Sequence, residues 1–361
     1  MSSTEISWKF YLDTKSAWQA IEDTVKAAEK SIDLELFILH NDQIGKPLLE
    51  TLKEKAKRGI NVRLLIDWLG SRHTYLLSND VPELRDAGIN IIFFNPLAPW
   101  DFRYKTFSYY RDHNKNIIVD SRAAFTGGIC VSSIMENWRE TTVKVEGSLV
   151  EQMQTAFDYM WNHADRKSLR IFGYAPSALE NEFSFILNIP HKGKRYLFDT
   201  VFIEISKAKR EINITNPYFV PTDNMFRLLK TKAKEGVSIR LITPRNPDSK
   251  IAKYATQYYI GKALKAGIRV YYYNGTVNHA KTITIDNNWS SVGSMNFDRL
   301  SLVHNFEGNI ISTNKDFIKE LNLHFQDDLK DCEELELGAW IKRPLIERFL
   351  TRLISIFRKW L

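Results

Sequence analysis

The sequence predicts an α/β protein built from two similar halves, each a mixed, mostly parallel sheet flanked by helices, which share one central active site. Three observations lead to this prediction. The pattern H-x-K-x4-D occurs twice, at residues 113–120 and 279–286. A turn of small residues follows each copy at the same spacing, at residues 127–128 and 293–294. The segments around the two copies also repeat one order of helices and strands.

The repeat can be followed segment by segment along both halves. In the first pair of segments, the end of a helix leads into a β-rich run. In the second and third pairs, a helix ends at a glycine and a strand follows. The two H-x-K-x4-D copies then lie in short strands rich in β-branched residues. The paired segments are 27–39 and 206–220, 52–67 and 229–244, and 84–95 and 264–274.

The repeat divides the chain into four predicted parts. A region with Gly173, Pro176 and an HKGK turn has the composition of a connector. The last residues lie outside the repeat. The predicted parts are the first half at 1–164, the connector at 165–195, the second half at 196–335 and a basic amphipathic helix at 336–361.

Composition limits the location of the protein and the partners it can have. The formal net charge is +7, which favours an anionic partner, either nucleic acid or anionic lipid. Two cysteines are too few for a disulfide framework. No apolar run approaches the roughly 20 residues of a membrane span, and no secretory signal is present. These features predict a cytoplasmic protein.

The repeated histidines and lysines point to phosphodiester chemistry. A phosphodiester resists attack because its charge repels nucleophiles and its alkoxide leaves poorly. Without a metal, cleavage needs a nucleophile, an acid and fixed positive charge. Histidine can supply the first two near neutral pH, and lysine supplies the charge. Residues i and i+2 of a strand face one side, so His113 and Lys115 share a pocket, as do His279 and Lys281.

Other polar residues follow each motif. Ser294 and Asn296 can donate to phosphate oxygens, and Gly128, in the matching turn, is predicted to lie at the phosphate with them. Glu140 and Glu307 can each bind the far ring nitrogen of an imidazole and fix its tautomer. Neither motif has a recognised metal-ligand spacing, so we predict no catalytic metal and no other cofactor.

The chain resembles the phospholipase D superfamily, and within it the bacterial cardiolipin synthases. The doubled motif carries the first resemblance. The second rests on longer strings spread over both halves and the C-terminus. These strings are NPYFVPTD at 216–223, YYYNGTVNHAKTITID at 271–286, GSMNFDRLSLVHNFEGN at 293–309, WRETTVKVEG at 138–147 and WIKRPLIERFLTRL at 340–353.

The resemblance implies transfer of a phosphatidyl group through a phosphohistidine. His113 would attack the phosphorus of phosphatidylglycerol, and His279 would protonate the departing glycerol. A second phosphatidylglycerol would then take the phosphatidyl group and give cardiolipin. The resemblance further implies that the lysines, Ser294 and Asn296 hold the phosphate, and that Asp120 and Asp286 support the site from behind.

One residue departs from the pattern of the family. Members of the family usually have asparagine where this chain has Cys130, as the second copy does at Asn296. A thiol is a poor hydrogen-bond donor. We therefore expect the first half to bind phosphate less strongly, and we expect Cys130 to be a small buried residue behind the turn.

The C-terminal residues predict a contact with a membrane surface. Apolar residues fall at helical spacing over 340–361, basic residues flank them, and tryptophans lie near both ends. Such a helix suits an anionic leaflet, which predicts peripheral association with the inner face of the cell membrane. Packing against the body or another subunit is the alternative. Residues 96–111, rich in aromatic and basic side chains, are a candidate lip for acyl chains or an ordinary loop.

Two other functions compete with cardiolipin synthesis. The same histidines could use water as acceptor, which would make the protein a phospholipase D or a nuclease. A nucleic-acid substrate is less favoured because the sequence has no evident Arg-rich or aromatic stacking repeat. The third reading is a catalytically weakened protein that binds anionic lipid. Because both halves lie in one chain, no oligomer is needed to complete the site.

Overall fold

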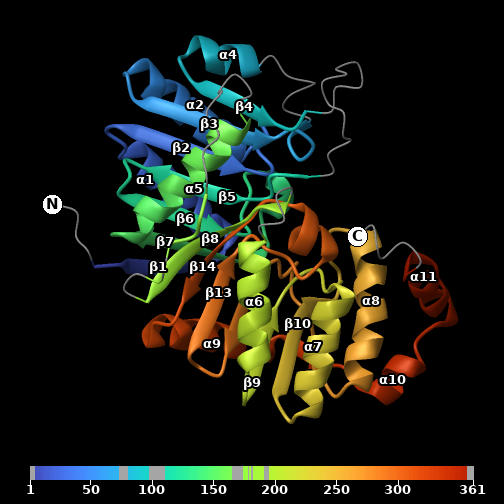
Figure 1. The fold of residues 1–361 in the computed structure, drawn as a ribbon. Helices are drawn as coiled ribbons and strands as arrows, with labels where there is room; N and C mark the ends of the chain where they lie inside the picture. The colour runs from blue at the N-terminus through green and yellow to red at the C-terminus, as the bar shows by residue number, and fades with distance from the viewer. Residues whose placement is uncertain are drawn as a thin grey trace.

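The structure, a computed structural model, describes residues 5–72, 80–96, 110–164, 174–177, 179, 182–190 and 195–355. It contains two sheets, each flanked by helices. In Figure 1 the N-terminal half is at the top, in blue and green, and the C-terminal half is below it, in yellow to red. The prediction of two α/β halves with mixed sheets is confirmed.

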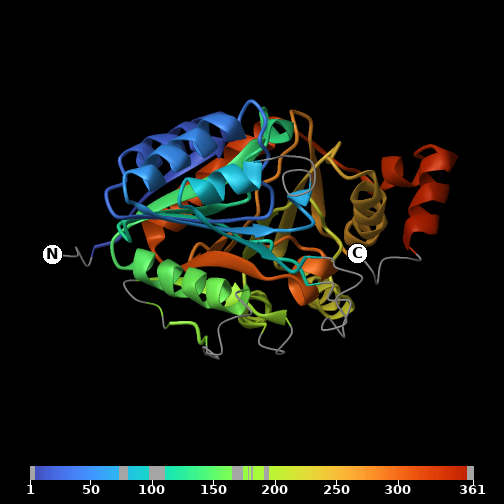
Figure 2. The ribbon, with the colours of Figure 1, turned by 90° about the horizontal axis from the view of Figure 1, so that it is seen from above.

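The sheet of the N-terminal half has seven strands in the order β1-β7-β6-β5-β2-β3-β4. Figure 2 shows α1 and α2 on one side of this sheet and α5 on the other. The strands are β1 (Ser7–Asp13), β2 (Ser31–Leu36), β3 (Asn61–Asp67), β4 (Asn90–Phe94), β5 (Lys115–Val119), β6 (Ala123–Gly127) and β7 (Arg139–Glu146). The helices are α1 (Thr14–Lys26), α2 (Gly45–Lys57), α4 (Asp80–Asp86), the short 3-10 helix η1 (Ser133–Met135) and α5 (Leu149–Ala164).

The sheet of the C-terminal half has eight strands in the order β15-β11-β10-β9-β12-β13-β14-β8. The strands are β8 (Phe183–Asn188), β9 (Glu211–Thr215), β10 (Ser238–Pro244), β11 (Arg269–Tyr273), β12 (Thr282–Ile285), β13 (Trp289–Gly293), β14 (Glu307–Ser312) and β15 (Cys332–Glu334). The helices are α6 (Tyr196–Lys207), α7 (Asp223–Lys234), α8 (Lys250–Lys265), the π-helix η3 (Leu300–His304), α9 (Lys315–Lys330), α10 (Leu337–Ile341) and α11 (Leu345–Ser355).

Parallel pairing is confined to three strands in each sheet, β2-β3-β4 and β9-β10-β11. The expectation that parallel pairs dominate is therefore corrected, because the other named strand pairs are antiparallel. The cause lies in the connections. Helices link the parallel strands, whereas β5 joins β6 and β12 joins β13 through short turns that permit only antiparallel pairing. Each turn begins with two residues of positive φ, as in tight hairpins.

Apolar packing joins the two halves into one body. A large buried cluster lies in each half, and a further large cluster contains residues from both sheets, including Val143 of β7 and Ile310 of β14. β8 falls inside the range predicted as connector, where it forms the edge of the second sheet beside β14. Most other residues of that range lie outside the described residues. The shared apolar cluster fixes the relative position of the halves, and hence of the two motifs.

The C-terminal segment differs from the single helix that the sequence predicts. It forms two helices, α10 and α11, with Pro344 directly before α11. Proline disfavours helical conformation in the residue before it, which separates the two helices. Residues 356–361 lie outside the described residues. Within the described part of the chain, no helix is both long and apolar enough to cross a bilayer.

Candidate active site

The two motifs begin where each half touches the other. The backbone N–H of His113 donates to the carbonyl of Phe306 at 3.0 Å, just before β14. The N–H of His279 donates to the carbonyl of Arg139 at 2.8 Å, at the start of β7. Each histidine is therefore attached through its backbone to a strand of the opposite half. The arrangement has approximate twofold symmetry and brings the two motifs together.

A carboxylate from the opposite half contacts each imidazole. His113 Nδ1 lies 2.9 Å from Glu307 Oε1, and His279 Nδ1 lies 2.6 Å from Glu140 Oε2. Both glutamates are fully buried. Since Nδ1 of each ring faces a carboxylate, Nε2 is the nitrogen that can meet a substrate. Neither half can complete a histidine–carboxylate pair on its own.

The lysines of the motifs bind the backbone of their own histidines. Lys115 Nζ donates to the carbonyl of His113 at 2.7 Å, and Lys281 Nζ donates to the carbonyl of His279. Lys281 Nζ also lies 2.9 Å from His279 Nδ1. Burial lowers the pKa of Lys281 to about 8, although Glu140 opposes the shift. These contacts hold the two ammonium groups next to the imidazoles, where a phosphate could receive them.

The two histidine–glutamate pairs differ in charge. Burial and then the positive charge of Lys115 hold the pKa of His113 well below its usual range. Burial raises the pKa of Glu307 to about 8, against the attraction of Lys115. The pKa of Glu140 moves the other way: burial raises it, but Lys281 and His279 together lower it further. At neutral pH His113 is therefore a neutral imidazole, while Glu140 is an ionised carboxylate.

Glu140 affects the imidazole it contacts. Burial, and then the charge of Lys281, lower the pKa of His279, and Glu140 opposes both. An ionised carboxylate at Nδ1 stabilises an imidazolium when a proton arrives at Nε2. His279 is thus better suited than His113 to carry a proton on Nε2. His113 is better suited to act as a nucleophile through the lone pair of its Nε2.

The turn after each motif meets the carboxylate of its own half. Ser294 Oγ donates to Glu307 and accepts from the N–H of Gly308 at 3.0 Å. At Gly128, the matching position, a Cβ atom would lie 2.4 Å from Glu140 Oε2. Only glycine therefore leaves room for Glu140 as it stands, and Glu140 has no hydroxyl partner there. Gly128 supplies space and Ser294 supplies a donor.

Asn296 and Cys130 occupy the next matching pair of positions. Both side chains are buried. Asn296 Oδ1 has no hydrogen-bond partner among the described residues. Burial raises the pKa of the Cys130 thiol, against the charges of Lys115 and Lys281, so the thiol is neutral. The second half therefore brings an amide to the site where the first brings a thiol.

Asp120 and Asp286 lie at the far ends of β5 and β12 from the histidines. Asp120 Oδ1 accepts from the N–H of Lys30 at 2.7 Å, and Asp286 Oδ1 accepts from the N–H of Arg210 at 2.7 Å. Burial raises the pKa of each carboxyl, but several backbone N–H bonds outweigh it and lower the pKa. From His113 to Asp120 an extended strand runs roughly 20 Å. The structure does not bring these aspartates to the imidazoles; they fasten the turns before β2 and β9.

Three aromatic rings beside the imidazoles have no assigned role in the sequence prediction. Phe37 lies 4.9 Å from His113, between ring centroids, and Trp138 lies 5.0 Å from His279. Tyr218 approaches His279 edge-on, with centroids 6.3 Å apart. Trp138 lies in the string WRETT and Tyr218 in the string NPYFVPTD, and both strings support the family resemblance. The sequence therefore contained a signal for these two rings. Phe37 follows β2 and had no such signal.

A group of buried carboxyls lies beneath His113. Asp67 Oδ2 accepts from the N–H of Asp112 at 3.0 Å, and Asp112 Oδ1 accepts from Asn114 Nδ2 at 3.0 Å. Asn114 Nδ2 also reaches Glu35 Oε1 at 3.1 Å. Burial raises the pKa of Asp112 to about 7 and that of Asp67 to about 6, and it raises that of Glu35 well above its usual value. The sequence prediction missed this network because its members come from three separate strands or loops.

Two further predictions concern metal binding and the acyl-chain lip. Within the described residues, no group of three or more His, Cys, Asp or Glu side chains is arranged to hold a metal ion. The metal-free site remains a prediction. The proposed lip at residues 96–111 lies almost wholly outside the described residues.

The sequence matches a known family over most of its length. Residues 21–161 and 201–329 match the family described as cardiolipin synthase, PLD-like domain. The chain is 32% identical over 366 residues to a cardiolipin synthase of Clostridium perfringens (strain SM101 / Type A), covering 96% of this chain and 75% of that protein. It is 30% identical over 356 residues to the probable cardiolipin synthase YwiE of Bacillus subtilis (strain 168), covering 96% of this chain and 70% of the relative.

The fold matches a solved structure at much lower sequence identity. The phosphatidylserine synthase of Haemophilus influenzae Rd KW20 superposes with a TM-score of 0.76 at 14% identity. The match covers 98% of this chain and 93% of that one. At this identity the match supports the two-half architecture alone.

Proposed function

The chain belongs to the cardiolipin synthase family of phospholipase D-like proteins, and we propose that it joins two phosphatidylglycerols into cardiolipin and glycerol. The observation that carries the proposal is the crossed pairing of His113 with Glu307 and of His279 with Glu140. It places two imidazoles with free Nε2 atoms, and two ammonium groups, around one site. A phosphodiester needs this combination of nucleophile, acid and positive charge.

In the first step, His113 Nε2 attacks the phosphorus of one phosphatidylglycerol. A bond between nitrogen and phosphorus forms, and the bond from phosphorus to the glycerol headgroup oxygen breaks. His279 Nε2–H gives its proton to that oxygen, and glycerol leaves. Lys115 and Lys281 offset the charge on the non-bridging oxygens.

In the second step, a hydroxyl of another phosphatidylglycerol attacks the same phosphorus. Its proton passes to His279, the nitrogen–phosphorus bond breaks, and His113 returns to the neutral imidazole. The product carries two phosphatidyl groups on one glycerol. His279 ends the cycle protonated, as it began, so protons and bonds balance.

The charges of the two pairs support this division of roles. A nucleophilic imidazole must be neutral, and the burial and lysines around His113 favour that form. An acid must hold a proton until the leaving group departs, and ionised Glu140 stabilises that proton on His279. We propose that Ser294 and Asn296, which are buried in the turn after β13, help hold the phosphate from the second half.

We further propose that the protein docks on an anionic membrane through α11. The apolar side chains of this helix face outward: Leu345 is 77% exposed, Ile346 64% and Phe349 62%. Its opposite side packs on α8, where Thr351 Oγ1 donates to Gln257 Oε1 at 3.0 Å. An exposed apolar row flanked by arginines suits the interface of a bilayer, where the lipid substrate resides.

Product analysis tests the reaction. Purified protein is incubated with vesicles containing labelled phosphatidylglycerol, and the lipids and soluble products are separated. Cardiolipin and glycerol in equal amounts are the expected products. Phosphatidic acid without cardiolipin would show that water is the acceptor, and no turnover of phosphatidylglycerol would contradict the proposal.

Substitution of two exposed apolar residues tests docking. Phe349→Ser with Leu353→Ser should reduce binding to phosphatidylglycerol-containing vesicles about tenfold or more, since each buried CH₂ contributes about 0.8 kcal/mol. The exposed Ile134→Ser, in η1 of the other half, is the control for loss of surface apolar area. Equal binding by the double variant and the control would contradict docking through α11.

A further inference from the structure

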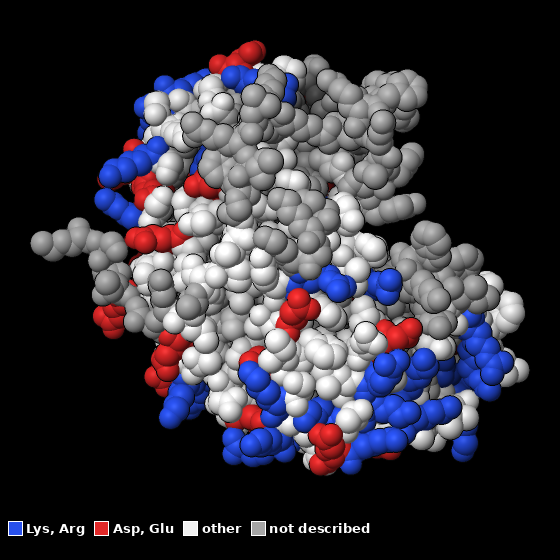
Figure 3. Space-filling model, in the orientation of Figure 1, with Lys and Arg blue, Asp and Glu red and all other residues white. Residues whose placement is uncertain are grey.

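A groove lined by basic residues lies between α8 and the C-terminal helices. It has a volume of about 420 Å³. Gly261 lies opposite Trp340 at one wall, so close that a Cβ on residue 261 would be 2.9 Å from Trp340 Nε1. The basic residues that line the groove are Lys262, Lys265, Arg343, Arg348 and Arg352. In Figure 3 lysines and arginines gather over the same region, where α7, α8 and the C-terminal helices lie.

Most basic groups of the groove have no acidic partner: in the part of the chain that the structure describes only Arg343 has one nearby, since Glu347 of α11 attracts its guanidinium. Lys262 Nζ lies 4.6 Å from the ring centroid of Tyr258, and the Arg343 guanidinium lies 4.1 Å from that of Trp340. Glu334 of β15 pairs with Arg269 of β11 at 2.7 Å and not with a basic group of the groove. A concave surface lined by five basic residues, of which only Arg343 has an acidic neighbour, favours an anion.

The groove adjoins the exposed apolar row of α11. Arg348 and Arg352 lie one turn apart on this helix, on the side between buried Thr351 and exposed Leu345. A single ligand could therefore place a negative group between α8 and α11 and an apolar portion along α11. Free phosphate and nucleic acid lack the apolar portion, whereas an anionic phospholipid has both.

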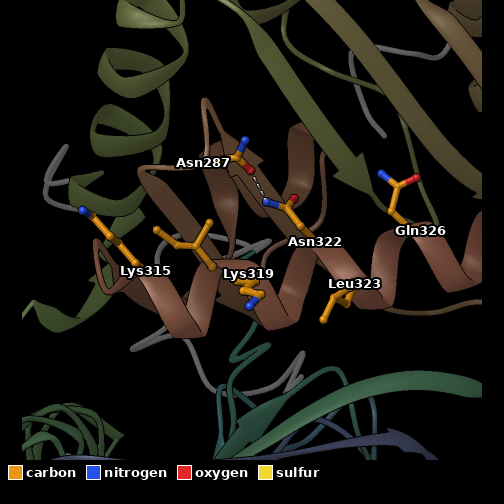
Figure 4. Close-up of a pocket in the computed structure, with 7 residues that line it drawn as sticks. Asn287, Lys315, Lys319, Asn322, Leu323 and Gln326 are labelled. Atoms are coloured by element: carbon orange, nitrogen blue, oxygen red, sulfur yellow. Dashed lines mark hydrogen bonds between the residues drawn. The ribbon is translucent and has the colours of Figure 1, made fainter.

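Another surface pocket lacks these features. It lies along α9, has a volume of about 260 Å³, and is lined by two lysines together with amide and aliphatic side chains. Figure 4 shows Asn322 in this pocket donating to Asn287, at 2.6 Å. Lys315 and Lys319 are its basic residues. It has fewer positive charges than the α8–α11 groove. It also does not adjoin the exposed apolar row of α11.

We propose that the α8–α11 groove binds the headgroup phosphate of an anionic phospholipid in the bilayer, as a site separate from the histidines. This inference rests on the docking part of the proposed function and goes beyond it. Docking through the apolar row needs only a lipid surface, whereas the groove recognises an individual headgroup. A headgroup held there fixes how α11 and the rest of the protein sit on the membrane.

Vesicle binding tests the site. The groove variant is Lys262→Gln, Arg348→Gln and Arg352→Gln, and the control is Lys46→Gln, Lys57→Gln and Arg58→Gln on α2 and its C-terminus. Both remove three positive charges. With vesicles of phosphatidylcholine and phosphatidylglycerol at fixed salt, the groove variant should bind about tenfold more weakly than the control, since basic residues near an anionic surface contribute strongly.

Equal losses in the two variants would show that net charge alone governs binding, and would overturn the groove. If wild-type protein does not bind the vesicles, docking itself fails, which is a separate outcome and does not depend on turnover. A charge-retaining variant, Lys262→Arg with Arg348→Lys and Arg352→Lys, should stay within about threefold of wild type. Thermal unfolding of each variant checks that the fold is kept.

Two further probes identify the occupant. Inorganic phosphate at millimolar concentration should not displace the protein from vesicles at constant ionic strength. Displacement would show a free-phosphate site and overturn the lipid assignment. Retention of a single-stranded oligonucleotide that depends on the groove residues, with vesicle binding unaffected by them, would overturn it in favour of nucleic acid.

Discussion

His113 and His279 occupy equivalent places in the two halves, but the groups beneath them differ. Below His113 lie the buried carboxyls of Glu35 and Asp112, whose pKa values are raised by burial. The equivalent positions in the second half, by register, are Thr215 and Asn278, which carry no charge. The two halves thus share the histidines and lysines of the motifs but differ in the groups that lie beneath them. The histidines of the two motif copies can therefore differ in their affinity for a proton.

The largest difference between the halves should appear when each histidine is removed. His113→Ala should lose about 10⁴-fold in kcat/KM on phosphatidylglycerol and also on a phosphodiester with a p-nitrophenol leaving group, because no nucleophile remains. His279→Ala should lose about 10³-fold on the lipid and at most about tenfold on the activated diester, whose leaving group needs no proton.

The covalent intermediate provides the matching measurement. His279→Ala with the activated diester should accumulate a phosphoenzyme that survives an alkaline quench, and His113→Ala should give none. If only His279→Ala abolishes the adduct, the roles of the two histidines are reversed. The site would then still be shared between the halves, but His279 would be the nucleophile and His113 the acid.

The two glutamates should respond unequally to loss of charge. Glu140→Gln should lower kcat/KM about 100-fold at pH 7, because ionised Glu140 stabilises the proton on His279. Glu307→Gln should cost about tenfold or less at the same pH, because burial raises the pKa of Glu307 to about 8 and the group is already largely uncharged.

Measuring kcat/KM from pH 5 to 9 distinguishes a role for the charge of each glutamate from a role in positioning the imidazoles alone. The loss in Glu307→Gln should grow as the pH rises through 8, where the wild-type carboxyl ionises. The loss in Glu140→Gln should not grow in that range. Equal losses at every pH would mean that both glutamates only hold the rings in place.

Much of this site could be predicted from the sequence, because the signal was local and repeated. His113 and Lys115 alternate along one strand, and the same spacing recurs at His279, so the shared face followed from strand geometry. The crossing of Glu140 to His279 could not be predicted. It depends on how β7 and β14 meet across the halves, and no spacing along the chain encodes that contact.

The parts that the sequence prediction missed have the same origin. Glu35 and Asp112 read separately as ordinary acids, and only the pairing of β2 with β5 brings them together. Asp120 shows the opposite case. It belongs to the repeated H-x-K-x4-D pattern, but its carboxylate stabilises the turn before β2 and does not contact an imidazole. The sequence overstates the parallel portion of the sheet, because the alternation of helices and strands favours parallel pairing while the tight turn after β5 requires antiparallel pairing.

Asp112→Asn makes the first half resemble the second and should change stability with pH. Burial raises the folded-state pKa of Asp112 to about 7, above its unfolded value near 3.8. Its contribution to stability is therefore present at acid pH and is lost as the pH rises towards and through 7. Asparagine does not ionise, so the variant should gain about 2–3 kcal/mol relative to wild type between pH 5 and pH 8, with the change occurring between pH 5 and pH 7.

Urea unfolding at the two pH values measures this change. Asn278→Asp is the reciprocal variant, and it should lose stability relative to wild type over the same range. A constant difference between wild type and Asp112→Asn at pH 5 and pH 8 would show that Asp112 is ionised throughout. The contrast between the two halves would then lie in the histidine–glutamate pairs alone.

The smallest expected effect concerns Asn296 and Cys130, a matching pair of turn residues that differ in their capacity to donate a hydrogen bond. Asn296→Cys should raise KM for phosphatidylglycerol about fivefold, because a neutral hydrogen bond contributes about 1 kcal/mol net. Cys130→Asn should lower KM by less than that, because Glu140 fills the space around Gly128 and restricts where a new amide can lie. Cys130→Ser is the control, because serine is more polar than cysteine but similar to it in size. If Cys130→Asn improves KM as much as Asn296→Cys worsens it, the halves hold the phosphate equivalently, and the asymmetry between them is confined to the charges beneath the histidines.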